Sequence, residues 1–211
     1  MIETLLAYAP TFGAVLLVNL LGWMSPGPNM MVVASSALSQ GTRAGIVTGC
    51  GVALGGLVWA SLAVLGVGLV FEALPALFML LKIAGGGYLI WLGVRHWRRA
   101  MRGQPPGAAS GEGRAFARGL AVVLTNPKAI LFFGAVFSAV IPADAPVWLL
   151  LVLLAVSQIQ SILQHAITAA LFGSRAARAG WRGAGASAER AVGAVFVALG
   201  AGVIWHTLRR A

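Results

Sequence analysis

Cysteine is almost absent from this chain of 211 residues, which contains only Cys50, and histidine occurs three times. A single cysteine cannot form a disulfide framework within the chain, and it cannot form a C-x-x-C redox pair. One cysteine and three scattered histidines also lack any spacing that is typical of a metal site. The sequence therefore excludes a dithiol redox enzyme and predicts neither a metal site nor another cofactor.

Charged residues are also scarce. They make up 9 % of the chain, against 59 % hydrophobic residues, and the mean hydropathy is +0.90. Soluble globular domains contain about 25 % charged residues, so an ordinary soluble domain is excluded. The N-terminal sequence Met1-Ile2-Glu3-Thr4 lacks the basic start of a cleavable signal peptide. We therefore expect the first apolar helix to remain in the mature protein.

Apolar runs long enough to cross a bilayer recur along the chain. The hydrocarbon core is about 30 Å thick and requires about 20 helical residues. By this measure the sequence predicts six spans, at residues 5–24 with a broken continuation to 40, 44–70, 76–92, 116–141, 147–172 and 191–205. We therefore expect an all-α polytopic membrane protein whose first partner is the lipid bilayer.

The net charge of +10 is concentrated in two connections between these spans. Six arginines lie between residues 95 and 118 and four between 175 and 190, whereas the other long connections carry single acidic residues, Glu72 and Asp144. Positively charged loops remain in the cytoplasm, so this pattern places both termini on the outer side. Arg209 and Arg210 at the C-terminus depart from the pattern. The arginines act as topology signals, and we expect no nucleic-acid partner.

Two helix-breaking motifs interrupt apolar spans. The first is Ser25-Pro26-Gly27-Pro28-Asn29 and the second is Thr125-Asn126-Pro127-Lys128. A broken helix persists in lipid only where protein or a water-filled cavity surrounds the freed backbone groups. Helix rise counted from the cytoplasmic ends places both breaks near the middle of the membrane. Paired breaks in two halves of a chain indicate a transporter's binding site, although a simple turn after the first helix would also explain the first motif.

A segment rich in glycine and proline, Gly103-Gln104-Pro105-Pro106-Gly107, separates three predicted spans from three others. An odd number of spans in each half makes the second half inverted relative to the first. We therefore predict six transmembrane helices in a 3+3 inverted repeat with broken first and fourth helices. Residues 1–99 form the first repeat with the Pro-Gly-Pro break, 100–114 a cytoplasmic linker, and 115–211 the second repeat with the Asn-Pro-Lys break.

The breaks carry groups that suit a zwitterion. A new helix begins after each break, and its first N–H groups have no partner within that helix. Asn126 is a strong N-cap with Pro127 at the favoured first position, and Pro28 follows Gly27 in the same way. Two helix N-termini would bind a carboxylate, with Lys128 as an added cation, unless Lys128 forms a structural ion pair. Carbonyls that end the preceding half-helices would accept an ammonium group.

The span at 147–172 contains a polar stripe. At 100° per residue its members fall within an arc of about 160°, and they are Ser157, Gln158, Gln160, Ser161, Gln164, His165 and Thr168. Such a stripe faces the bundle, where it either forms hydrogen bonds between helices or lines a substrate pathway with His165 as a titratable group. The candidate substrate-binding residues are thus Ser25, Pro26, Gly27, Pro28, Asn29, Asn126, Pro127, Lys128, Gln160, Gln164 and His165.

Several motifs follow one another in the first two thirds of the chain. They are Ser25-Pro26-Gly27-Pro28-Asn29, Gln40-Gly41-x3-Gly45, the glycines from Gly49 to Gly55, Lys82-x2-Gly85-x2-Tyr88-Leu89-x3-Gly93, and Asn126-Pro127-Lys128-Ala129-x2-Phe132-Phe133. This ordered set resembles the LysE/RhtB family of amino-acid exporters, of the homoserine, threonine or leucine efflux type. The resemblance implies a multi-pass protein of the bacterial inner membrane with six helices, which exports amino acids and is driven by the proton gradient.

The chain departs from the family's pattern at Gly56, where many relatives carry an acidic residue, and no carboxylate lies within any predicted span. Our main hypothesis is a secondary transporter that exports amino acids or similar small zwitterions by alternating access. The alternative is a heavy-metal cation permease of the same superfamily, which would require clustered thiols or carboxylates. An enzyme is not expected, because no nucleophile has an orienting base. The sequence leaves open whether the protein forms a homo-oligomer.

Overall fold

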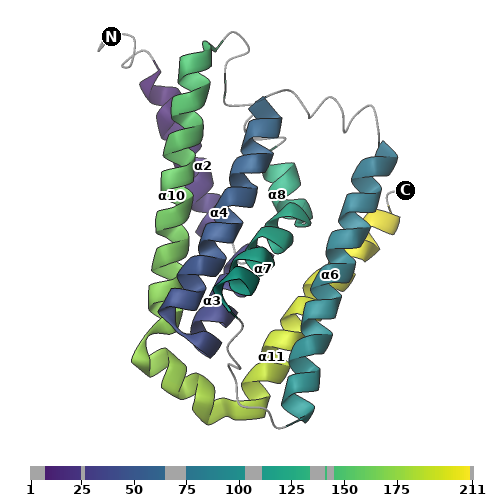
Figure 1. The fold of residues 1–211 in the computed structure, drawn as a ribbon. Coiled ribbons are helices and arrows are strands. Elements are labelled where there is room, and N and C mark those ends of the chain that lie inside the picture. Colours follow the sequence, from purple (N-terminus) through teal and green to yellow (C-terminus); the bar gives the residue numbers. More distant parts are fainter. Residues whose placement is uncertain are drawn as a thin grey trace.

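The computed structural model describes residues 8–24, 27–64, 75–102, 111–133, 141 and 145–209 of the protein (Figure 1). All regular elements among these residues are helices. In chain order they are α2 (Ala9–Met24), α3 (Pro28–Gln40), α4 (Thr42–Val64), α6 (Pro75–Met101), α7 (Glu112–Leu124), α8 (Pro127–Phe132), α10 (Val147–Gly173) and α11 (Arg175–Leu208). The prediction of an all-helical protein is therefore confirmed for the described part of the chain.

The first break separates α2 from α3. The two helix directions differ by 60°, so no continuous helix passes through. Gly27 is the N-cap of α3 with extended backbone, and Pro28 takes the first helical position, as predicted. At the other end Gly41 has a φ of 103°, which favours glycine, and its N–H donates to the carbonyl of Ala37. Ser25 and Pro26 lie outside the described residues.

The second break separates α7 from α8. Thr125 ends α7, and Asn126 is the N-cap of α8 with Pro127 at the first helical position. The Asn126 side chain accepts a hydrogen bond of 3.0 Å from the backbone N–H of Lys128. The N-cap predicted from the Asn-Pro-Lys sequence is therefore confirmed, and it satisfies one of the N–H groups that a helix start leaves unpaired.

Helix α4 lies at the centre of one part of the bundle and packs against α3, α7 and α10. Its glycines permit this close approach, because a Cβ atom at Gly49 would stand 2.7 Å from the Cβ of His165 on α10. A Cβ atom at Gly51 would meet the backbone of α7 at Phe116. The glycine repeat thus allows α4 to contact two neighbours on two faces.

Helices α6 and α11 form the second part of the bundle and pack closely along each other (Figure 1). A Cβ atom at Gly93 would meet the Gly193 carbonyl, and one at Gly193 would stand 2.8 Å from the Gly93 carbonyl. Gly185 has a φ of 52° and interrupts the helical geometry of α11. The stretch before this kink runs across one end of the bundle, and the stretch after it follows α6.

Three helices among the described residues are long and apolar enough to cross a membrane: α4, α10 and α11. The bent pair of α2 and α3 would make a fourth span. The protein is thus a multi-pass membrane protein of helical class. Helix α10 reproduces the predicted span 147–172 closely, whereas the predicted spans 44–70 and 116–141 extend beyond the described residues. The total of six stays a prediction.

The arginine-rich segments gather at one end of the molecule. The end of α6, the start of α7 and the turn from α10 to α11 lie together there, while α2 begins and α11 ends toward the opposite end (Figure 1). Arg43 at the start of α4 and Glu112 at the start of α7 join the same end through a salt bridge of 2.7 Å. This arrangement agrees with the predicted placement of the basic connections on one side of the membrane.

Candidate functional site

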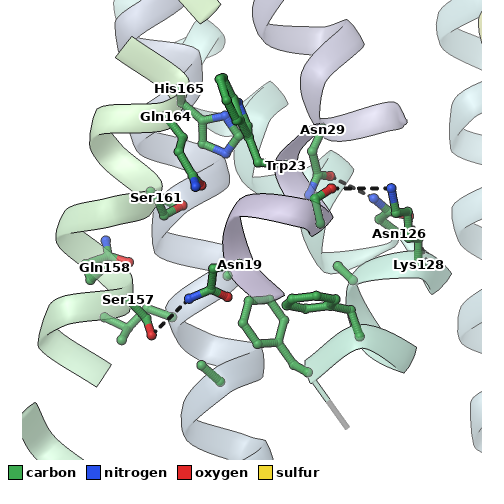
Figure 2. A pocket seen from close by; sticks show the side chains of 18 of the residues that line it. Asn19, Trp23, Asn29, Asn126, Lys128, Ser157, Gln158, Ser161, Gln164 and His165 are labelled. Atoms are coloured by element: carbon green, nitrogen blue, oxygen red, sulfur yellow. Dashed lines mark hydrogen bonds between the residues drawn. The ribbon is translucent and has the colours of Figure 1, made fainter. Parts of the chain in front are cut away.

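The two breaks meet inside the helix bundle (Figure 2). The side-chain amide of Asn126 donates a hydrogen bond of 2.8 Å to the side-chain oxygen of Asn29, across 97 positions of sequence. A Cβ atom at Gly22, in the last turn of α2, would stand 2.9 Å from the ring of Phe132 on α8. The C-terminal end of α2 and helix α8 are therefore in direct contact.

A cavity of about 110 Å³ lies at this meeting point. Helices α2, α3, α4, α8 and α10 enclose it, together with residues of the second break. Its polar lining consists of Asn19, Trp23, Asn29, Asn126, Lys128, Ser157, Gln158, Ser161, Gln164 and His165. Its apolar lining includes Leu57, Phe132, Phe133 and Leu154. Polar groups thus converge on an apolar-walled cavity, which is the usual composition of a small-molecule site.

Two of the polar groups have no hydrogen-bond partner among the described residues. They are Nε2 of Gln164 and Nδ1 of His165, on side chains that are 8 % and 7 % exposed. A buried polar group without a partner costs about 1–3 kcal/mol, so most such groups in proteins are satisfied. Both residues lie across the cavity from Asn29 and Lys128 (Figure 2). A bound polar molecule could supply the missing partners.

The chain is similar to known proteins along most of its length. The family described as LysE type translocator matches residues 20–207. The chain belongs to this family. Threonine efflux proteins from Salmonella typhimurium (strain LT2) and from Escherichia coli K12 are each 30 % identical to it over 195 residues, which are 90 % of this chain and 95 % of each relative.

Another Escherichia coli K12 protein, the uncharacterized membrane protein YahN, is 31 % identical over 180 residues, or 82 % of this chain and 79 % of that protein. No solved structure matches the chain. The family resemblance predicted from the ordered motifs is therefore confirmed. The protein is a transporter of the LysE type and not an enzyme.

In this LysE type translocator the polar stripe of α10 serves two purposes. One group holds α2: Ser157 accepts from the Asn19 amide at 3.2 Å, and Thr168 accepts from the Trp23 indole N–H at 3.1 Å. Gln160 belongs to this group, because its amide donates to the Leu16 carbonyl at 2.9 Å and it is not part of the cavity lining. The other group faces the cavity and comprises Gln158, Ser161, Gln164 and His165. Both interpretations of the stripe therefore apply, and Ser157 belongs to both groups because it also lines the cavity.

Lys128 bridges the two breaks. Its ammonium group donates to the carbonyl of Gly22 at a distance of 3.4 Å. Gly22 lies in the last turn of α2, where carbonyls have no partner within the helix and the dipole attracts a cation. Lys128 opposes the dipole of its own helix α8 but complements the dipole of α2. Sequence reasoning missed this contact because it joins residues 106 positions apart.

The two helix N-termini at the breaks differ in how their first N–H groups are bound. The N–H of Lys128 is already bound by the Asn126 side chain, and α8 spans six described residues. Helix α3 spans 13 residues and has no side-chain cap, and two residues of its first turn, Asn29 and Met30, line the cavity. The N-terminus of α3 is therefore the better placed of the two for a negatively charged group.

Of the other predicted site residues, Gly27 lines the cavity, whereas Pro28 is buried and is not part of the lining. Pro127 begins α8. Asn19 and Trp23 were not predicted, although an amide and an indole N–H within the apolar helix α2 were available signals. Gly56, the departure from the family pattern, also lines the cavity. No group of three or more His, Cys, Asp or Glu side chains gathers within the described part of the chain.

Proposed function

We propose that this translocator exports a small amino acid from the cytoplasm through the cavity where its two breaks meet. The observation that carries the proposal is the Asn29–Asn126 contact of 2.8 Å beside a cavity in which two polar groups have no partner among the described residues. Membership of the LysE type family supports transport, and the names of the threonine efflux relatives support an amino acid as substrate. Side chains and backbone groups of this chain would provide every polar contact to the substrate.

The substrate's two charges fit different parts of the cavity. Its carboxylate would lie near the N-terminus of α3 and the ammonium group of Lys128, because both attract negative charge. Its own ammonium group would lie near the carbonyls that end α2, where Lys128 already finds the Gly22 carbonyl. A hydroxyl or amide on the substrate side chain would reach Nε2 of Gln164 and Nδ1 of His165, which have no partner among the described residues. Ser25 and Pro26 remain candidates through their position in the first break.

The size of the cavity favours a short side chain. Its volume of about 110 Å³ is smaller than the engineered cavity of about 150 Å³ that binds benzene. A long substrate such as lysine would require the surrounding helices to separate further than threonine would. Threonine or an amino acid of similar size is therefore the first substrate to test.

We also propose that the six predicted spans form the 3+3 inverted repeat, with residues 1–99 and 115–211 as its halves and 100–114 as the linker. Helix α4 packs against α7, and α10 packs against α3 and α2. If the two halves are exchanged, the contact of α4 with α7 corresponds to the contact of α10 with α2 and α3. The contact of α6 with α11 corresponds to itself. Such symmetry would permit alternating access around the central cavity, in the bacterial inner membrane and driven by the proton gradient.

The proposal is tested by a panel of single amino acids. Cells that express the protein are exposed to a toxic concentration of each amino acid, and export of any that becomes tolerated is measured from loaded vesicles. Two variants of α10 form a matched pair: Gln164→Met removes an unpartnered amide from the cavity, and Gln160→Met removes an amide outside it. We expect Gln164→Met alone to weaken export. If no amino acid is tolerated or exported, the proposed function is wrong.

A further inference from the structure

The carboxylate of Glu189 is buried in the contact between α6 and α11. Its side chain is 1 % exposed, and its Oε2 lies 2.7 Å from Nδ1 of His96 on α6. Its other oxygen, Oε1, has no hydrogen-bond partner among the described residues. Burial of a carboxylate with one oxygen unsatisfied is costly, so this pair is not explained by stability.

The residues around Glu189 in the sequence do not indicate this burial. Glu189 precedes the predicted sixth span at 191–205 and follows an arginine-rich connection, where an exposed side chain is expected. The structure instead continues α11 through Glu189 after the kink at Gly185 and packs this turn against α6. The chain contains five acidic residues, and the two that the structure describes differ sharply: Glu112 is exposed, and Glu189 is enclosed.

A second, smaller cavity adjoins the pair. Its volume is about 10 Å³, which is close to the minimum that holds one water molecule. Helices α3, α6, α7 and α11 line it, and its polar lining consists of Ser35, Arg95, His96, Arg99 and Arg118. A water there would have several polar partners and would contact the imidazole of His96. The pair is thus enclosed by protein but adjoins a place for water.

Among the described residues, the charged side chains that line this small cavity are basic. Helix α6 contributes Arg95 and Arg99, and Arg99 lies within electrostatic reach of Glu189. Helix α7 contributes Arg118. Besides Arg95 and Arg99, Arg118 also interacts electrostatically with Tyr88 of α6. Helix α3 contains no titratable residue, and its Ser35 is the polar group on that side. On α11 itself, the adjacent Arg190 is exposed. One carboxylate therefore lies among several guanidinium groups, and gain of a single proton changes the local charge balance.

We propose that His96 and Glu189 form the proton-carrying site of this translocator. This inference rests on the proposed function as an exporter. For each amino acid that leaves, the pair takes up one proton from the outer side, at the imidazole or at the free Oε1, and releases it through the small cavity to the cytoplasm. The proton is neither created nor consumed, so the exchange balances as amino acid out and proton in.

Helix α3 connects the proton site to the substrate cavity. Asn29 and Met30 line the large cavity, and Val32 and Ser35 line the small one. Ser35 lies six positions after Asn29, which corresponds to about 9 Å along a helix. A charge change at His96 and Glu189 that alters the contact of α3 with α11 would therefore shift α3 at the first break. A single rigid element that both sites contact provides the physical link that coupling requires.

Two transport assays in vesicles containing the full-length protein separate this inference from the proposed function. The first measures export of L-threonine driven by a pH gradient, and the second measures exchange of labelled for unlabelled L-threonine without any gradient. For Glu189→Gln we expect driven export to fall at least tenfold and to lose its pH dependence, while exchange stays within about twofold of wild type. His96→Gln should alter the pH profile in the same assays. Glu112→Gln, at the exposed carboxylate, is the matched control and should behave as wild type.

The outcomes are distinct. If the wild-type protein exchanges neither L-threonine nor any amino acid of the panel, the proposed function fails. If exchange occurs and Glu189→Gln keeps wild-type driven export and pH profile, only the proton-site inference is overturned. Should Glu189→Gln not fold, infrared spectroscopy of the wild type decides, since five acidic residues give few overlapping bands. We expect L-threonine binding to change the carboxylic-acid band in wild type and in Glu112→Gln; an unchanged band in both refutes the inference.

Discussion

The two breaks of this translocator border one cavity but treat their backbone groups differently. The first break begins α3 at Gly27, which has no side chain to cap the helix, so the donors of that first turn remain for a ligand. The second break begins α8 behind Asn126, whose side chain accepts the Lys128 N–H. The second break thus binds one of its own N–H donors and offers the ammonium group of Lys128 to a ligand instead. Two similar sequence motifs therefore produce a site with unequal halves, which suits a substrate with two different ends.

The largest expected effect comes from removing the cation of the second break. Hydrogen bonds to charged groups contribute about 1.5–3 kcal/mol, so in Lys128→Ala we expect the half-saturating concentration of L-threonine to rise about 10-fold to 150-fold. The half-saturating concentration is measured from export rates of vesicles loaded with increasing concentrations of L-threonine. Lys82→Ala, at the chain's other lysine, is the control, because Lys82 is not part of the cavity lining. Equal export by wild type and Lys128→Ala would show that the cation does not contact the substrate.

A smaller effect should distinguish the two asparagines. Asn126→Ala loses both the N-cap, at about 1 kcal/mol, and the hydrogen bond to Asn29, at about 0.5–1.5 kcal/mol. Asn29→Ala loses only that hydrogen bond. We therefore expect Asn126→Ala to be less stable than Asn29→Ala by about 1 kcal/mol. Unfolding of both purified variants in the same detergent measures the difference, and equal stability would contradict the unequal capping of the two breaks.

The smallest effect concerns the wall of the cavity opposite both breaks. No carboxylate among the described lining residues faces His165, and charging a buried imidazole without such a partner is costly. If the proton site is at His96 and Glu189, we expect His165→Gln to weaken L-threonine binding but to leave the pH profile of export unshifted. A shifted profile would return His165 to the role of titratable group that the sequence left open. Transport at a series of pH values in wild type and variant decides between them.

Prediction from the sequence was most successful where the cause is local. The cap at Asn126 and the helix start at Pro28 follow from residue type and spacing alone, and α10 began and ended within one residue of its predicted span. Prediction was weaker where partners are far apart in the chain. The stripe of α10 predicted polar contacts but not which of its residues bind α2 and which face the cavity. Only the position of α2 decides that Gln160 bonds to Leu16 while Gln164 faces the cavity.

By itself the sequence determined that this protein is a helical membrane protein with two interrupted helices, because apolar length, proline and capping residues act on their own neighbourhood. The tertiary structure decided which groups those interruptions bring together. It placed Lys128 on the end of α2 and enclosed Glu189 against His96. Neither contact can be predicted from local sequence, since each depends on how helices from opposite halves of the chain pack against each other.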